Sequence, residues 1–171
     1  MALDEISLLV LDVDGVLTDG SIVLDDHGVE TKRFHVRDGT GIRIWQRLGN
    51  QVAVITGRTG MALRHRAEEL GISLIYDASD AKHRDFTDVL NRLNLAASNA
   101  AVVGDDLPDL TIMKLAGYAI AVGDASAEVR SVADFVTSAA GGRGAVREAI
   151  EHILKAQDRW DEAVAIFSQT Q

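Results

Sequence analysis

Two aspartates separated by one residue follow an apolar run near the start of the chain. Asp12 and Asp14 come directly after residues 8–11 and precede Gly15. Side chains alternate along an extended strand, so both carboxylates face the same way while the strand continues. Such a pair also occurs in ordinary turns and in fragments of Ca²⁺-binding loops. Its position directly after a buried strand favours a functional site, with carboxylates available for metal binding or proton transfer.

A hydroxyl and a lysine follow in two later segments. Thr56 and Gly57 end the apolar run 51–55. The Thr56 hydroxyl and the backbone N–H groups after it can bind a phosphoryl oxygen without adding charge. Lys82, near the start of a predicted helix, could offset the repulsion between a bound phosphate and an aspartate nucleophile. The alternatives are a helix cap for Thr56 and a solvated surface position for Lys82.

A cluster of acids follows a third apolar run. Asp105, Asp106 and Asp109 come after residues 100–104. Mg²⁺ prefers oxygen ligands and keeps several waters, so one or two carboxylates and a substrate oxygen suffice to hold it. Asp105 occupies the same position after its strand as Asp12, which favours it as a ligand. Asp106 could instead cap the helix that Pro108 begins.

These segments belong to an alternating pattern of strands and helices. Near-continuous apolar runs typical of buried strands cover residues 6–12, 51–56, 73–76, 100–104, 118–122 and 135–137. Apolar residues at helical spacing lie between them, in segments 42–48, 61–70, 86–93 and 146–154. The alternation predicts an α/β fold with a doubly wound, Rossmann-like parallel sheet. Ligands of such sheets bind beyond the carboxyl ends of the strands.

One segment interrupts the alternation. Extended runs at residues 21–24 and 30–36 are joined by Asp25-Asp26-His27-Gly28, whose Asp and Gly residues favour a turn. This pattern predicts a β-hairpin over about residues 20–36 that projects from the end of the first strand.

Length and composition limit the classes of function. The 171 residues, 47% of them hydrophobic, are enough for one domain with one core, and we expect it over residues 1–157 with a tail over 158–171. The absence of cysteine excludes thiolate metal sites and thiol nucleophiles. A net charge of −9 argues against nucleic-acid binding. No run approaches the ~20 apolar residues of a membrane span, and no signal peptide is evident, so we expect a cytoplasmic protein without membrane contact.

The order of acid pair, hydroxyl, lysine and acid cluster resembles the four sequence motifs of the haloacid dehalogenase superfamily of phosphotransferases. The resemblance implies that Asp12 is the nucleophile and forms an aspartyl-phosphate. Asp14 would protonate the leaving alcohol and then activate water. Thr56 and Lys82 would complete the catalytic group.

The same resemblance implies a metal site. Mg²⁺ would be held by Asp12, the backbone carbonyl of Asp14, and Asp105, and it would neutralise the phosphoryl oxygens. Asp106 and Asp109 would support this set of ligands.

A closer resemblance is to the capless sugar-acid phosphatases that act on 3-deoxy-D-manno-octulosonate 8-phosphate in the pathway to lipopolysaccharide. It reaches to about residue 157 and is carried by residues 12–20, 34–39, 56–58, 104–106 with Asp109, and 141–148. The resemblance implies a small sugar-acid phosphate as substrate. Its binding residues would be Thr56, Gly57, Arg58, Lys82, Arg37 and Arg143, with Arg58 recognising the carboxylate.

No segment is long enough for a cap domain. Residues 14–56 hold a hairpin and one helix, and residues 58–82 hold one helix and a strand. A phosphoaspartate needs shelter from water, so we expect a hairpin of another subunit to cover the site in a homo-oligomer, most simply a tetramer. The tail departs from the closest members of the family, and Trp160, Val164 and Phe167 could form a short amphipathic helix.

Three alternatives remain open from the sequence. Phosphatases of nine-carbon sugar-acid 9-phosphates of the sialic acid or KDN type share this scaffold, and Arg58 in place of a glutamate favours the eight-carbon sugar. A receiver-type signalling domain would carry its phosphorylated aspartate on a central strand, where this chain has Thr56. A catalytically inactive oligomerisation module would turn over no phosphomonoester.

Overall fold

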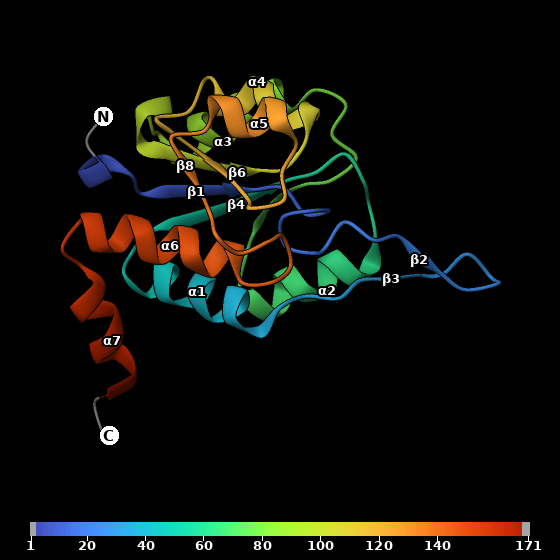
Figure 1. The fold of residues 1–171 in the computed structure, drawn as a ribbon, viewed down its shortest axis with the longest axis horizontal. Coiled ribbons are helices and arrows are strands. Elements are labelled where there is room, and N and C mark those ends of the chain that lie inside the picture. The colour runs from blue at the N-terminus through green and yellow to red at the C-terminus, as the bar shows by residue number, and fades with distance from the viewer. Residues whose placement is uncertain (1–2, 169–171) are drawn as a thin grey trace.

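A parallel sheet forms the centre of the molecule. The computed structural model describes residues 3–168 and contains a six-stranded sheet in the order β5-β4-β1-β6-β7-β8, with every pairing parallel (Figure 1). The strands are β1 (Leu8–Leu11), β4 (Gln51–Ile55), β5 (Leu74–Tyr76), β6 (Ala100–Gly104), β7 (Tyr118–Ala121) and β8 (Phe135–Val136). Each lies within a run predicted from the sequence, and the predicted α/β fold class is confirmed.

Helices cover both faces of the sheet (Figure 1). One layer contains α1 (Val36–Arg47), α2 (Met61–Leu70) and α6 (Ala145–Ala156), and the other contains α3 (Lys82–Leu93), α4 (Leu110–Met113) and α5 (Ala127–Val132). Short 3₁₀ helices lie at η1 (Leu3–Glu5), η2 (Ala97–Asn99) and η3 (Leu107–Asp109). Trp45 of α1 and Phe86 of α3 are the largest fully buried side chains. The central strands β1, β4, β6 and β7 are therefore largely enclosed on both faces, as their continuous apolar sequence predicts, whereas the edge strands β5 and β8 are only partly buried.

The hairpin projects from the body of the protein (Figure 1). It consists of β2 (Val23–Leu24) and β3 (Glu30–Thr31), which pair antiparallel. Asp25 closes the turn, because its Oδ1 accepts hydrogen bonds from the backbone N–H groups of His27 and Val29. The prediction that the second extended run reaches residue 36 was wrong. Pairing ends at Thr31 because β2 offers no further partner, and α1 already begins at Val36.

The end of the chain forms one more helix, α7 (Trp160–Ser168). It packs against α1 and α6, with Ala163 fully buried and Phe167 mostly exposed. The division of the chain into a domain and a tail stays a prediction, and the last residues of that tail, 169–171, lie outside the described part. Between residues 3 and 168, no helix has the length and apolar character needed to cross a membrane.

Candidate active site

The carboxyl ends of three neighbouring strands bring the predicted residues together. β1 pairs with both β4 and β6, so Asp12, Thr56 and Asp105 leave the sheet side by side. They line a cavity of about 570 Å³. Nine of the residues singled out in the sequence lie on its wall: Asp12, Asp14, Thr56, Gly57, Arg58, Lys82, Asp105, Asp106 and Asp109.

Lys82, the first residue of α3, connects two carboxylates. Its Nζ lies 2.7 Å from Oδ1 of Asp12 and 2.7 Å from Oδ1 of Asp109. The Lys82 side chain is only 9% exposed. Burial lowers its pKa, but the two adjacent carboxylates outweigh this effect and raise the pKa above its usual value. Lys82 is therefore a fixed cation beside the predicted nucleophile.

Three carboxylates meet at one point of the cavity. Oxygen atoms of Asp12, Asp105 and Asp109 all lie within 4.8 Å of one another. Burial, followed by the charge of Asp109, raises the pKa of Asp12 to about 6. Burial, followed by the charge of Asp12, raises the pKa of Asp105 to about 7. A site with this excess of negative charge and only oxygen donors fits a hard divalent cation such as Mg²⁺.

Asp109 differs from its two neighbours because both of its oxygens already have partners. Oδ1 accepts from Lys82, and Oδ2 accepts from the backbone N–H of Asp105 at 3.0 Å. The side chain is 2% exposed. This arrangement suits a residue that orients Asp105 and Lys82, in line with the supporting role expected of it. Asp106 is exposed at the start of η3.

Gly15 allows the loop after β1 to approach Asp105. Its φ is +98°, a left-handed conformation that favours glycine. A Cβ atom at this position would lie 2.0 Å from Oδ2 of Asp105. The glycine that follows the acid pair is therefore required by the close contact between two separate strand ends.

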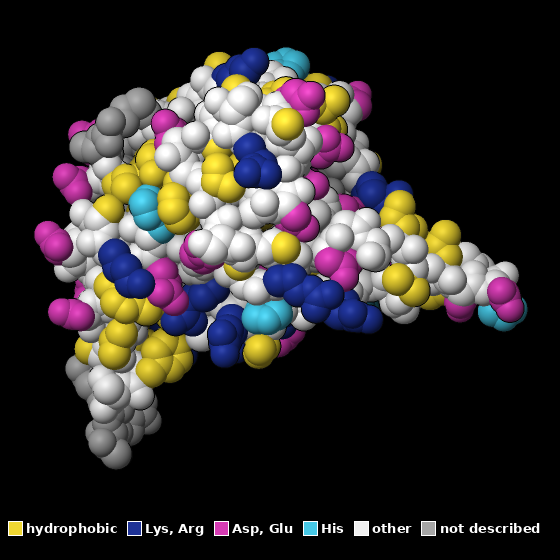
Figure 2. Space-filling model, viewed as in Figure 1, with side chains coloured by type: hydrophobic (Ala, Val, Ile, Leu, Met, Phe, Trp, Pro, Cys, Tyr) yellow, Lys and Arg dark blue, Asp and Glu magenta, His cyan; other side chains and the backbone are white. Residues whose placement is uncertain are grey.

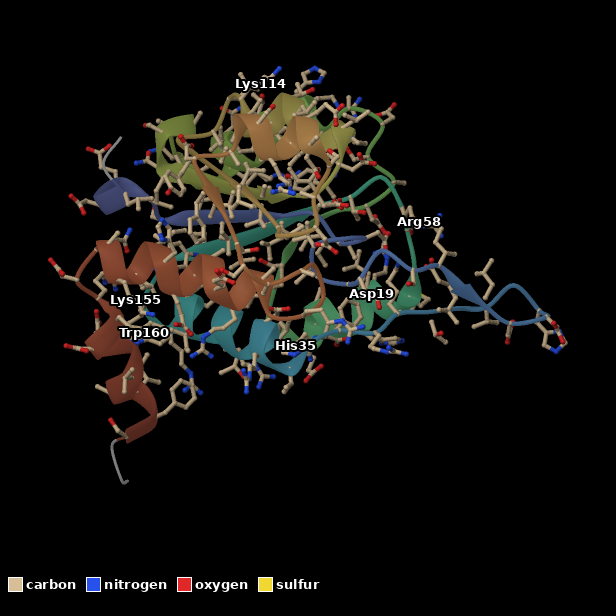
Figure 3. All side chains as sticks on the ribbon, viewed as in Figure 1. Asp19, His35, Arg58, Lys114, Lys155 and Trp160 are labelled. Carbon is tan, nitrogen blue, oxygen red and sulfur yellow. The ribbon has the colours of Figure 1, made fainter. Side chains whose placement is uncertain are left out.

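Asp14 has a partner that the sequence did not reveal. Lys32, just beyond β3, donates a hydrogen bond to Oδ1 of Asp14 and is 3% exposed. Nε of Arg58 lies 3.6 Å from Oδ2 of Asp14, and the Arg58 guanidinium also binds Glu30 at 2.7 Å. Figure 3 shows Arg58 between the sheet edge and the hairpin. Lys32 could be found only from the path of the hairpin, because it follows no apolar strand.

Thr56 is held by the segment after β5. It is 2% exposed, and its Oγ1 accepts a hydrogen bond from the backbone N–H of Arg58 at 3.4 Å. The backbone N–H of Ser79 binds the Thr56 carbonyl at 3.0 Å. Ser79 also lines the cavity and was not predicted from the sequence. This contact fixes the Thr56–Arg58 turn against the loop that leads to Lys82.

Two residues predicted to bind the substrate, Arg37 and Arg143, lie outside the cavity of Asp12. Arg37 and Arg143 line a different cavity of about 400 Å³, together with Arg147. Arg143 is 3.7 Å from Asp19, an exposed ion pair. Both arginines stand at the beginnings of helices in the α1 and α6 layer and not at strand ends. The structure of the single chain does not bring them into the cavity of Asp12, and their contact with the substrate stays a prediction.

Comparison with known proteins gives the family. The model of the haloacid dehalogenase-like hydrolases matches residues 73–150. The 3-deoxy-D-manno-octulosonate 8-phosphate phosphatase KdsC of Escherichia coli K12 is 46% identical over 94% of this chain and 85% of its own length.

Solved structures show the same similarity. The Moraxella catarrhalis 3-deoxy-D-manno-octulosonate 8-phosphate phosphatase, in complex with magnesium ion, phosphate ion and KDO, has a TM-score of 0.94 at 41% identity, covering 98% of this chain and 96% of that one. The cobalt-bound deoxy-D-mannose-octulosonate 8-phosphate phosphatase of Haemophilus influenzae has a TM-score of 0.92 at 38% identity, covering 99% and 96%.

Proposed function

Because this chain belongs to the 3-deoxy-D-manno-octulosonate 8-phosphate phosphatase family of haloacid dehalogenase-like hydrolases, we propose that it removes the phosphate of that sugar acid. One observation of the structure carries the proposal. Lys82 bridges Asp12 and Asp109 at 2.7 Å, next to Asp105, on the wall of one cavity. This arrangement supports the proposed roles of Asp12 as nucleophile, Lys82 as a fixed cation and Asp105 as a metal ligand at the same place.

The metal of this reaction is Mg²⁺. Asp12, Asp105 and the backbone carbonyl of Asp14 would hold it, and the magnesium ion of the Moraxella catarrhalis structure supports this choice. Carboxylate and carbonyl oxygens are the ligands that Mg²⁺ prefers. When bound, the ion neutralises charge on the phosphoryl oxygens.

The side chains perform two displacements. A carboxylate oxygen of Asp12 attacks phosphorus, the bond from phosphorus to the sugar oxygen breaks, and Asp14 gives its proton to that oxygen. Asp14 then takes a proton from water, which attacks the aspartyl-phosphate and releases inorganic phosphate and free Asp12. Lys82 and the Thr56 hydroxyl hold the phosphoryl oxygens through both steps.

Arg58 selects the sugar acid. Its guanidinium lines the cavity, is 46% exposed and is oriented by Glu30. A planar guanidinium can bind the substrate carboxylate through two parallel hydrogen bonds. The preference for an eight-carbon over a nine-carbon sugar rests on this residue.

The active form is a homo-oligomer, most simply a tetramer. Ile22, Val23, Leu24 and Val29 of the hairpin are each more than half exposed. Figure 2 shows apolar side chains along the projecting arm, which extends away from the rest of its own chain. A hairpin of this kind can lie against a second copy and reduce the access of water to a neighbouring cavity. The cytoplasmic location stays a prediction.

Phosphate release from a panel of phosphomonoesters tests the function. The panel contains 3-deoxy-D-manno-octulosonate 8-phosphate, a nine-carbon sugar-acid 9-phosphate and p-nitrophenyl phosphate, each with and without Mg²⁺. We expect Mg²⁺-dependent turnover with preference for the eight-carbon substrate, and almost none for folded Asp12→Asn and Asp14→Asn. Equal turnover of all three compounds would refute the proposed preference for the eight-carbon substrate. No turnover of any of them would refute the proposed phosphatase activity.

A further inference from the structure

Residues 34–39 and 141–148 line no part of the main cavity, and the two stretches meet at the beginning of α6. Asp38, in the first turn of α1, is 2% exposed. Its Oδ1 accepts a hydrogen bond from the backbone N–H of Arg147 at 2.8 Å, although 109 residues separate them. Figure 3 shows His35 at the start of α1, beside the loop that leads into α6.

α6 has no capping side chain of its own. Its N-cap residue is Gly144, and no side-chain hydrogen bond comes from that position. The first N–H groups of a helix have no partner within the helix and need an acceptor. Asp38 supplies this acceptor from another helix. Burial raises the pKa of Asp38, and the backbone N–H groups of Arg147, Gly144 and Val146 partly oppose that rise.

The loop before α6 is packed against the catalytic loop. The backbone N–H of Gly142 binds the carbonyl of Val16 at 2.9 Å, and that of Gly141 binds Asp124 at 2.8 Å. A Cβ atom at Gly141 would lie 1.7 Å from the carbonyl oxygen of Gly15. Gly15 is therefore enclosed between this loop and Asp105.

We infer that Asp38 is a positioning residue for the proposed reaction. By fixing the start of α6, it holds residues 141–144 against the loop that follows β1, and so keeps Asp12 and Asp14 in place toward Asp105. This inference rests on the proposed function for its kinetic test. It accounts for residues 34–39 and 141–148, which line no part of the main cavity.

The test compares Asp38→Ala and Asp38→Asn with a matched control, Asp134→Ala. Asp134 accepts a hydrogen bond from the backbone N–H of Ala119 at 2.8 Å. This contact lies near the beginnings of β7 and β8, whereas the cavity lies at the carboxyl ends of the strands. For Asp38→Ala we expect kcat to fall roughly tenfold or more with little change in KM, because small displacements of reacting groups are costly. Asn keeps an acceptor at the Oδ1 position, so Asp38→Asn should restore most of kcat. Asp134→Ala should lose thermal stability and keep the kcat of the wild type.

A metal readout makes the test independent of turnover. The Mg²⁺ concentration that gives half of the maximal shift in melting temperature should rise about tenfold in Asp38→Ala, as for other residues that orient metal ligands indirectly. An unchanged kcat and an unchanged Mg²⁺ midpoint in Asp38→Ala would overturn the inference, as would an Asp38→Asn no better than Asp38→Ala. If the wild type fails to turn over any phosphomonoester, the proposed function fails, and the Mg²⁺ midpoints still decide the role of Asp38.

If Asp38→Ala does not fold, a further variant, Asp38→Glu, still tests the inference. Asp38→Glu keeps the charge and displaces the acceptor by one methylene group. We expect it to lose more kcat than Asp38→Asn, and wild-type kinetics in Asp38→Glu would contradict the inference.

Discussion

Lys32 of the hairpin and Asp14 of the catalytic loop form a buried ion pair, 18 residues apart in the sequence. The Lys32 side chain is 3% exposed, and its Nζ is also 3.4 Å from Glu30. Glu30 in turn binds Arg58. The hairpin therefore contributes charges to the same chain's active site, in addition to the exposed apolar face proposed for contact with another copy.

Loss of the Lys32 charge should slow the chemical steps. In Lys32→Met the Asp14 carboxylate loses its fixed partner, and we expect kcat to fall about tenfold or more, within the range of general acid–base effects. Steady-state kinetics with saturating Mg²⁺ measure this. Lys114→Met, at an exposed position on the α4 side, is the control and should behave as the wild type. Equal rates for the two variants would show that Lys32 has no part in the reaction.

A methyl group at Gly15 should displace Asp105. Gly15→Ala adds a Cβ 2.0 Å from Oδ2 of Asp105, in a backbone with a φ of +98°. Gly28→Ala in the hairpin turn is a matched control, because its φ is +76° and no atom lies within 4 Å of the added Cβ. Both variants should lose about 1–2 kcal/mol of stability from backbone strain. Only Gly15→Ala should also lose Mg²⁺-dependent phosphate release, and retention of that activity would contradict the close contact.

Without metal, the stability of the protein should fall as the pH rises from 5 to 8. The folded-state pKa values of Asp12 and Asp105, about 6 and about 7, lie above the ordinary value of 3.8. The folded state therefore binds more protons than the unfolded state in this range, and stability decreases as the pH passes through those two values. Mg²⁺ at pH 8 should restore it by binding only the folded state. Melting curves at several pH values, with Mg²⁺ or a chelator, measure both effects.

Removal of the Asp105 carboxylate should stabilise the metal-free protein and abolish Mg²⁺ binding. Asp105→Asn should raise the melting temperature at pH 8 without metal, because one buried charge disappears, and should abolish the shift caused by Mg²⁺. Asp106→Asn, at the exposed neighbouring position, should change neither. A lower melting temperature of metal-free Asp105→Asn would mean that the carboxylate stabilises the fold.

A charge on the hairpin should weaken association. Val23→Asp places a carboxylate on a side chain that is 53% exposed in the single chain. If that side chain is buried against another copy, light scattering after gel filtration should show a smaller species, with reduced turnover. Val164→Asp on α7, at a side chain that is 49% exposed, is the control and should keep the wild-type mass. An unchanged mass for Val23→Asp would place the interface elsewhere.

The amino-acid sequence by itself determined the strands and the residues at their ends. Continuous apolar runs identify buried strands, and a parallel sheet brings the carboxyl ends of its strands to one edge. The sequence alone therefore places Asp12, Thr56 and Asp105 together at that edge. Lys82 followed from its position at the start of a helix and from the resemblance to the family.

Only the tertiary structure decided the contacts between distant segments, because no local sequence pattern predicts them. The pairing of Lys32 with Asp14 depends on how the hairpin leaves the body, and the capping of α6 by Asp38 depends on how two helices pack. The separation of Arg37 and Arg143 from the cavity also depends on this packing, since both stand at helix beginnings. Periodicity describes which face of an element is apolar, whereas contacts between distant segments depend on the path of the whole chain.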